Sequence, residues 1–294
     1  MKGVFPAFPT IFDKEGKLLL DDMDNLLEFA KNSGVDGIFL HLVGGEYYKL
    51  ELEERKRSII AAVNLAPLGL PIYVNASSQS FNTSLEIIKL CEQIGVNGII
   101  LNSPHFSPLK GENAAFSAVT LNLISKTDLP VILQFYDPEP PSSNTILRNF
   151  LSHENVVAVK LEGANYLELA KETTKTGRHV DMLGGMYSYD LEKELNFGFS
   201  GTVPGLSIAR HIKRAFQLYE QHKTEEFRRV LDNIRPIQKK FLENFDSFPY
   251  FERFALHKMG LISVLGYRMP TLLPSAEELR SFELLIKNIL LTST

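Results

Sequence analysis

The chain has 294 residues, of which 44% are hydrophobic and 22% are charged, and its formal net charge is −4. This is the composition of a soluble globular protein long enough for one large core, and it excludes a broad basic surface for nucleic acid. The single cysteine, Cys91, excludes an internal disulfide and fits a reducing compartment.

The N-terminal stretch MKGVFPAFPTIF lacks the long apolar core of a signal peptide. No uninterrupted apolar run approaches the ~18 residues of a membrane span. We therefore expect a cytoplasmic protein without membrane contact. No Cys/His cluster of the metal-binding kind is present, and we expect neither a metal nor an organic cofactor.

Short apolar runs alternate along the chain with longer amphipathic segments. The predicted strands are Val4–Ala7, Gly37–Leu40, Ile72–Asn75, Gly98–Asn102, Val131–Gln134, Val156–Lys160, Met182–Gly184 and Gly201–Val203. The predicted helices between and after them are Asp22–Asn32, Leu52–Asn64, Ser84–Ile94, Glu112–Ser125, Thr145–Leu151, Tyr166–Thr174, Tyr189–Asn196 and Ser207–His222. Eight strands, each followed by a helix, predict an α/β fold, the (β/α)8 TIM barrel.

Two junctions, NSGVDGIFL and QIGVNGIIL, repeat one pattern of helix, glycine and strand. Their first glycines, Gly34 and Gly95, suit helix C-caps, and their second glycines suit tight turns into the strands. These are structural signals and carry no chemistry.

Residues 224–294 contain no further strand candidate. Their predicted helices are Glu226–Asn244, Tyr250–Leu261 and Ser275–Leu291. We therefore expect residues 1–223 to form the barrel and residues 224–294 to form a C-terminal helical extension of the same domain.

A lysine ends the apolar strand in VVAVKLEG. Val156–Val159 suit a strand covered on both faces, where an unpaired ammonium is expensive to bury. Reacting groups of a barrel come from the C-terminal ends of its strands, and burial lowers the pKa of a lysine. Lys160 could then attack a ketone and form a Schiff base. The structural alternative is a lysine that pairs with a carboxylate such as Glu162, or reaches solvent.

The loop HLVGGEYYKL follows the second predicted strand. The backbone amides of Gly44 and Gly45 could form a nest for a carboxylate, with Glu46 as a structural partner that holds the loop. The alternative is a plain tight turn.

Together these residues resemble the dihydrodipicolinate synthase / N-acetylneuraminate lyase family, the Schiff-base class I aldolases of the (β/α)8 fold. The resemblance covers nearly the whole chain. It is carried by PAFPTIFDKEG, GGEYYKLELEER, NSPHF, LPVIL, NVVAVKLEG, LGGMYSYDLEKELNFGFSGTVPG, HKMG and YRMP. It implies that Lys160 forms the imine, and that the substrate is bound by Val43, Gly44, Gly45, Glu46, Phe106, Gly185 and Val203.

The chain departs from the family at its proton relay. The family's threonine aligns with Val43, the tyrosine after strand five with Gln134, and the interface tyrosine with Phe106, so all three hydroxyls are missing. Tyr136 could replace the strand-five tyrosine if the loop shifts. Further candidates for moving protons are a bound water, His41, His105 and Tyr47, because an unperturbed histidine titrates near neutral pH.

A second departure concerns the substrate. The loop DPEPPSSN, residues 137–144, lacks the arginine that binds the second substrate in dihydrodipicolinate synthases, which argues against that activity. The Gly-Gly-Glu form resembles the branch that acts on 2-keto-3-deoxy sugar acids. Polar side chains at the ends of strands three and four suit a hydroxylated substrate or the loop backbone; they are Asn75, Ser77, Asn102 and Ser103.

The resulting hypothesis is a lyase, an aldolase or a dehydratase, that binds a 2-oxo acid such as pyruvate or a sugar-acid derivative as an imine on Lys160. One alternative is a catalytically impaired or repurposed barrel that binds a small carboxylate. Another is a phosphate-binding barrel that uses Gly184, Gly185 and 202–205. By resemblance we expect a homotetramer built as a dimer of dimers. The sequence does not identify the substrate or the proton donor.

Overall fold

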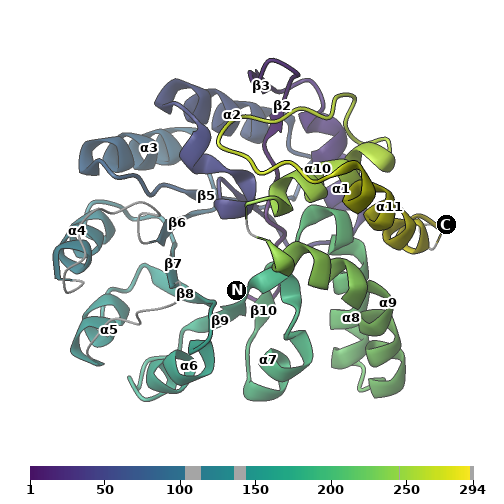
Figure 1. Cartoon of the computed structure of the whole chain (residues 1–294). Helices are drawn as coiled ribbons and strands as arrows, with labels where there is room; N and C mark the ends of the chain where they lie inside the picture. The colour runs from purple at the N-terminus through teal and green to yellow at the C-terminus, as the bar shows by residue number, and fades with distance from the viewer. Residues whose placement is uncertain (103–113, 136–143, 245, 292–294) are drawn as a thin grey trace. The chain divides into compact units, whose positions relative to one another are not determined.

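The computed structural model describes residues 1–102, 114–135, 144–244 and 246–291 (Figure 1). Within these residues, eight strands form one large sheet. The predicted fold class, an α/β (β/α)8 TIM barrel with a C-terminal helical extension, is confirmed.

The chain divides into two compact units. The first comprises residues 1–2, 71–186 and 190–202, and the second comprises residues 3–70, 187–189 and 203–294. The division at residue 223 between barrel and extension stays a prediction.

The first unit alternates parallel strands with helices. Its strands are β5 (Ile72–Asn75), β6 (Gly98–Asn102), β7 (Val131–Phe135), β8 (Val156–Leu161), β9 (Asp181–Gly184) and β10 (Gly201–Thr202), each hydrogen-bonded to the next. Its helices are α3 (Phe81–Ile94), α4 (Ala114–Ile124), α5 (Asn144–Leu151), α6 (Tyr166–Thr174) and α7 (Leu191–Phe197). Figure 1 shows these helices along the outer side of the strands. The strands and helices predicted for this region are present, with small differences at their ends.

The register of β7 and β8 decides which side chains share a face. Gln134 is paired with Lys160, and Phe135 with Leu161. The Phe135 ring lies 6.3 Å from the ring of Phe150 in α5, so this residue faces the helices. Because neighbouring residues of a strand point to opposite faces, Gln134 and Lys160 point away from the helices.

Helix α3 shows how the sequence sets an element's ends. Its N-cap is Ser80, whose side chain accepts a hydrogen bond from Thr83 N (3.4 Å), and its C-cap is Gly95 with φ 76°. The C-cap role predicted for Gly95 is therefore confirmed. At the start of β6, a Cβ on Gly98 would lie 2.6 Å from Pro130 O, so the close approach of β7 requires glycine there.

The second unit contains the beginning and the end of the chain. Its elements before the helical extension are β1 (Gly3–Val4), β2 (Ile11–Phe12), β3 (Leu18–Leu19), α1 (Met23–Asn32), β4 (Ile38–Leu40), η1 (Val43–Gly45), η2 (Tyr47–Lys49), α2 (Leu52–Leu65), η4 (Leu206–Ile208) and α8 (Ala209–Glu220). Ala7 forms parallel bridges to both Phe39 and Gly205, which joins the first strand region to β4 and to the segment after β10.

The antiparallel pair β2–β3 is absent from the sequence-based prediction. It pairs Ile11 with Leu19 and Phe12 with Leu18. Each strand has two residues, which is too short to show a period of two in the sequence.

The extension consists of α9 (Thr224–Glu243), α10 (Phe248–Lys258) and α11 (Ala276–Leu291), as predicted apart from the exact ends. Phe282 of α11 is fully buried, and its ring lies 5.6 Å from Phe241, 4.9 Å from Phe251 and 6.2 Å from Phe254. One aromatic side chain thus packs against both other helices of the extension.

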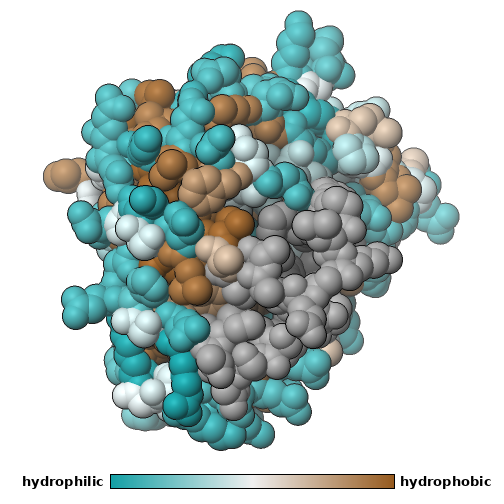
Figure 2. All heavy atoms as spheres, turned by 90° about the vertical axis from the view of Figure 1, so that its left-hand side faces the viewer, coloured by the Kyte–Doolittle hydropathy of each residue, from teal (hydrophilic) through white to brown (hydrophobic). Residues whose placement is uncertain are grey.

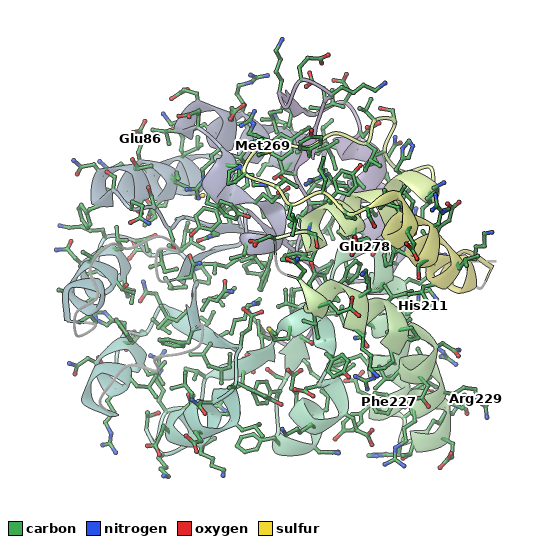
Figure 3. The ribbon with its side chains drawn as sticks, viewed as in Figure 1. Glu86, His211, Phe227, Arg229, Met269 and Glu278 are labelled. Atoms are coloured by element: carbon green, nitrogen blue, oxygen red, sulfur yellow. The ribbon has the colours of Figure 1, made fainter. Side chains whose placement is uncertain are left out.

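Helix α9 is amphipathic. Phe227 is buried and its ring lies 5.5 Å from Tyr219 of α8, whereas Arg229 is exposed. Figure 3 shows Arg229 pointing away from α8 into solvent. The helix pair α8–α9 therefore buries an apolar seam along its length.

One side of the molecule carries side chains of mixed character. Figure 2 turns the side that carries α3 and α4 toward the viewer, and hydrophilic and hydrophobic side chains are interspersed on it. In the part of the chain that the structure describes, no helix is both long enough and apolar enough to cross a bilayer.

We predict that Phe282→Ala lowers the free energy of unfolding by about 3–5 kcal/mol, because it leaves a cavity among three aromatic neighbours. Leu284→Ala on the same helix is the matched control, since Leu284 is 64% exposed, and its effect should stay within about 0.5 kcal/mol. Denaturant unfolding of both variants measures the difference. Equal unfolding midpoints would show that the aromatic cluster does not stabilise the extension.

Candidate functional site

Lys160 lies at the end of β8 and is 2% exposed. The strand forms here because Val156–Val159 are apolar and mostly β-branched. Its pairing with Gln134 fixes the lysine on the face turned away from the helices. A buried ammonium at this place needs a partner.

That partner is Glu162, two residues further along the chain. The Lys160 ammonium forms an ion pair with one carboxylate oxygen of Glu162, and both side chains are buried. The other oxygen accepts a hydrogen bond from Gln134 Nε2 at 2.8 Å. The backbone amide of Met186 donates to the first oxygen at 3.1 Å. The carboxylate is therefore fixed in front of the lysine from three sides.

Burial and the ion pair act in opposite directions on both groups. Burial lowers the pKa of Lys160, and Glu162 opposes this shift without cancelling it. Burial alone would raise the pKa of Glu162, but Lys160, Gln134 and the Met186 amide together hold it below its usual value. Glu162 is thus ionised near neutral pH, and Lys160 releases its proton more readily than a free lysine.

Gly185 makes room for this carboxylate. A Cβ on Gly185 would overlap the side chain of Glu162. The three residues that follow, η3 (Met186–Ser188), have φ values of 46°, 56° and 59°, a left-handed turn without glycine. Such a conformation costs roughly 1–2 kcal/mol per residue. Strain of this kind is concentrated at functional sites, and here it directs the Met186 amide at Glu162.

A second buried carboxyl, Glu194 of α7, lies on the other face of β9. A Cβ on Gly184 would overlap its carboxyl group, and Gly184 is paired with Leu161, which has the orientation opposite to Lys160. Burial, followed by the nearby carboxylates of Asp190 and Glu162, raises the pKa of Glu194 well above its usual range. Burial thus favours the neutral form of Glu194, which lies behind the strand and does not face the lysine directly.

Polar side chains continue along the neighbouring strand ends. Asn102 is paired with Gln134 across β6 and β7, and its backbone amide donates to Ser77 Oγ at 2.7 Å. The backbone amide of Ser77 in turn donates to Asn75 Oδ1 at 3.0 Å. The sequence suggested two roles for these residues, binding a hydroxylated substrate or supporting the backbone. Asn75 and Ser77 accept hydrogen bonds from the backbone.

The predicted carboxylate nest belongs to the second unit. Val43, Gly44 and Gly45 form the short helix η1, in which Gly45 N donates to Leu42 O at 2.9 Å. The Gly45 amide is therefore engaged within its own turn. A role of these residues in binding a substrate stays a prediction.

Glu46 is enclosed by cations. Its carboxylate forms ion pairs with Lys49 and with Arg253 of α10, and all three side chains are buried. Arg253 also donates to Gly266 O at 3.1 Å. Both carboxylate oxygens are occupied, so Glu46 holds the loop, and a direct contact with a substrate is an untested prediction.

His41 does not have the ordinary pKa that the sequence suggested. It is 2% exposed, and its Nε2 lies 2.8 Å from Ser58 Oγ. Burial, and then the charge of Arg55, lower its pKa well below the usual value. His41 is therefore neutral at physiological pH.

A phosphate-binding site built on Gly184 and Gly185 would need free backbone amides, but carboxyl groups lie in these places. Gly184 and Gly185 are covered by Glu194 and Glu162. At the start of η4, Glu252 accepts hydrogen bonds from Ser207 N and Ser207 Oγ, both at 2.7 Å. Buried carboxyl groups therefore occupy the space beside Gly184 and Gly185 that a bound phosphate would need.

The remaining predicted residues divide between the second unit and the undescribed segments. Val203 is buried in the second unit, after β10. Tyr136, Phe106 and His105 lie outside the described residues. Of the predicted catalytic set, the structure brings Lys160 and Gln134 together. Among the described residues, no three His, Cys, Asp or Glu side chains are grouped as metal ligands.

From the sequence, Glu162 is expected only as a possible ion-pair partner of Lys160. A signal was available, because Lys160 and Glu162 have the same parity along an extended segment and so share a face. The burial of Glu194 and the left-handed turn at Met186–Ser188 had no such signal, since neither a polar helix position nor a run without glycine announces them.

Residues 1–289 match the family described as the dihydrodipicolinate synthetase family. The chain is 27% identical over 245 residues to a probable 5-dehydro-4-deoxyglucarate dehydratase of Bacillus subtilis, which covers 80% of this chain and 77% of the relative. It is 24% identical over 181 residues to a probable 2-dehydro-3-deoxy-D-pentonate aldolase of Escherichia coli, covering 60% of each.

The fold is similar to the crystal structure of dihydrodipicolinate synthase from Rhodopseudomonas palustris. The TM-score is 0.88 at 19% identity, with 98% of this chain and 97% of that chain covered. At this level of identity the likeness concerns the fold.

We predict that Glu162→Gln lowers the pKa of Lys160 further, because the substitution removes the negative charge that opposes the effect of burial. The midpoint is measurable by NMR titration of the ε-carbon of isotope-labelled lysine, assigned with Lys160→Ala. Glu194→Gln is the control and should shift the midpoint less, since Glu194 has the weaker influence on Lys160. An unchanged midpoint in Glu162→Gln would contradict the coupling.

Proposed function

Because the chain belongs to the dihydrodipicolinate synthetase family, whose members include aldolases and dehydratases, we propose that it is a lyase that binds a 2-oxo acid as an imine on Lys160. The single observation that carries this proposal is the buried Lys160 with Glu162 fixed against its ammonium. The substrate we propose is pyruvate or a 2-keto-3-deoxy sugar acid.

Imine formation requires a neutral amine. Lys160 gives its proton to Glu162 or to water, and the amine attacks the ketone carbon C2 of the substrate. The oxygen of C2 takes up two protons, one from the attacking nitrogen and the one that Lys160 released at the start, and leaves as water. A protonated C=N bond remains. The lowered pKa of Lys160 supports the first step, since less free energy is needed to remove its proton.

Glu162 is our candidate for the proton transfers that the missing tyrosine would otherwise perform. Gln134 stands in the tyrosine position and cannot exchange protons near neutral pH. It instead donates a hydrogen bond to Glu162 and thereby orients the carboxylate. A positioned base of this kind contributes about 10²–10⁴-fold in rate.

The position of Glu162 favours dehydration over aldol cleavage. In an imine on Lys160, carbon C3 is two bonds from Nζ, whereas a hydroxyl on C4 is four bonds away. A carboxylate next to Nζ therefore reaches the C3 proton first. Its removal gives an enamine, and the C4–O bond can then break with loss of water. Aldol cleavage would need the base at the C4 hydroxyl.

The proposal excludes a standard dihydrodipicolinate synthase activity. Val43, Gln134 and Phe106 replace the family's three relay hydroxyls, and residues 137–144 contain no arginine. Tyr136 remains a candidate for an additional proton donor. Val43, Gly44, Gly45, Glu46, Gly185 and Val203 remain the proposed substrate-binding set. A cytoplasmic homotetramer that needs no cofactor is part of the same proposal.

A second candidate function is a non-catalytic barrel that binds a small carboxylate. The observation that favours it is the ion pair itself, because a lysine neutralised by Glu162 is also what a purely structural role predicts. The two candidates differ in whether Lys160 forms a covalent bond.

We expect that borohydride traps an adduct on Lys160 when the protein is incubated with pyruvate or with 2-keto-3-deoxy sugar acids. Peptide mass spectrometry locates the added mass. Lys160→Ala should abolish the adduct, and Lys171→Ala, which removes an exposed lysine of α6, should leave it unchanged. Absence of any adduct in folded protein would favour the binding protein.

A further inference from the structure

Two amide side chains on the lysine's side of the sheet have hydrogen-bonding atoms without a partner among the described residues. Asn102 is 3% exposed and Gln134 is 2% exposed. In the described part of the chain, Asn102 Oδ1, Asn102 Nδ2 and Gln134 Oε1 have no hydrogen-bond partner. Unpaired buried polar atoms are rare in folded proteins and each calls for an explanation.

The register places these atoms on the lysine's side of the sheet. Asn102 is paired with Gln134, and Gln134 with Lys160, so the three residues stand side by side on β6, β7 and β8. Residues paired in this way point to the same face, and neighbouring strands are about 4.8 Å apart. The unused atoms therefore belong to side chains on the same side of the sheet as Lys160, where the imine would form.

Hydrogen bonds hold the backbone of Asn102 and the side chain of Gln134 in place. The backbone N–H of Asn102 donates a hydrogen bond to Ser77 Oγ at 2.7 Å. Gln134 is held by its bond to Glu162 at 2.8 Å, which also fixes the identity of its two end atoms, because only the nitrogen can donate to a carboxylate. The free atom of Gln134 is thus an acceptor.

The set of unused atoms defines the chemistry of its ligand. It comprises two acceptors, Gln134 Oε1 and Asn102 Oδ1, and one donor group, Asn102 Nδ2. A carboxylate only accepts, and it would be repelled by Glu162 nearby. An ammonium only donates. A hydroxyl group both donates and accepts, and it satisfies both kinds of atom.

We infer that Asn102 and Gln134 form a subsite for a hydroxyl group of the substrate, carried on a carbon close to the imine carbon. The inference rests on the proposed function and narrows it to hydroxylated 2-oxo acids. Pyruvate fills the lysine part of the site and leaves the amides unsatisfied. Asn102 is then a residue that determines specificity and takes no part in imine formation.

The test compares two acids that differ by one hydroxyl, 2-oxopentanoate and 4-hydroxy-2-oxopentanoate. The concentration that half-saturates borohydride trapping is measured for each by intact mass. In the unmodified protein it should be at least about tenfold lower for the hydroxylated acid, as expected for one or two hydrogen bonds to uncharged groups.

Asn102→Leu should remove this preference while leaving the value for 2-oxopentanoate unchanged. Asn102→Ser, which replaces the amide by one hydroxyl, should show an intermediate preference, and it carries the test if the leucine variant does not fold. Asn122→Leu, which replaces an exposed amide of α4, is the matched control and should behave like the unmodified protein.

Equal half-saturation by the two acids in the unmodified protein would overturn the inference and leave the proposed function intact. If Asn102→Leu raised the half-saturating concentration by the same factor for both acids, the inference would be overturned as well. No adduct with either acid or with pyruvate, in folded protein, would overturn the proposed function and this inference together.

Discussion

The proposed chemistry depends on one buried ion pair, between Lys160 and Glu162. A lysine in this position is costly without a counter-charge, and a carboxylate is equally costly without a cation. Each group therefore determines the charge of the other. In the proposed reaction Lys160 is the nucleophile and Glu162 is the base, and a proton passes between them along the ion pair. Gln134 restrains the base without competing for the proton.

Two features of the fold position this ion pair: the register of the strands and the volume left free by a glycine. Strand pairing puts Asn102, Gln134 and Lys160 at one level, and the alternation of side chains turns them away from the helices. Gly185 leaves the volume that the Glu162 side chain fills. The left-handed turn after Gly185 directs the backbone amide of Met186 at the carboxylate. The free-energy cost of this turn is therefore associated with holding the amide in that orientation.

Much of the architecture could be predicted from sequence because local patterns encode it. Apolar β-branched runs gave the strands, and residues such as Gly95 gave the helix ends. The β2–β3 pair was not predicted, because strands of two residues are too short to show an alternation of apolar and polar side chains. At the site, the position of Lys160 was predictable from its strand. The lowered pKa of His41 was not, because it arises from burial and from Arg55, which only the folded chain brings close. For the same reason, the sequence did not show that the missing side chain of Gly185 admits Glu162.

The central claim is that Glu162 moves protons at the carbon next to an imine on Lys160, and proton exchange measures this directly. Pyruvate in deuterated water is followed by NMR of its methyl group in the presence of the protein. The account predicts that the unmodified protein exchanges the methyl protons for deuterium, and that Glu162→Gln slows this exchange by about 10²–10⁴-fold while still forming the trapped adduct. Exchange at an undiminished rate in Glu162→Gln would contradict the account, because another group would then be the base.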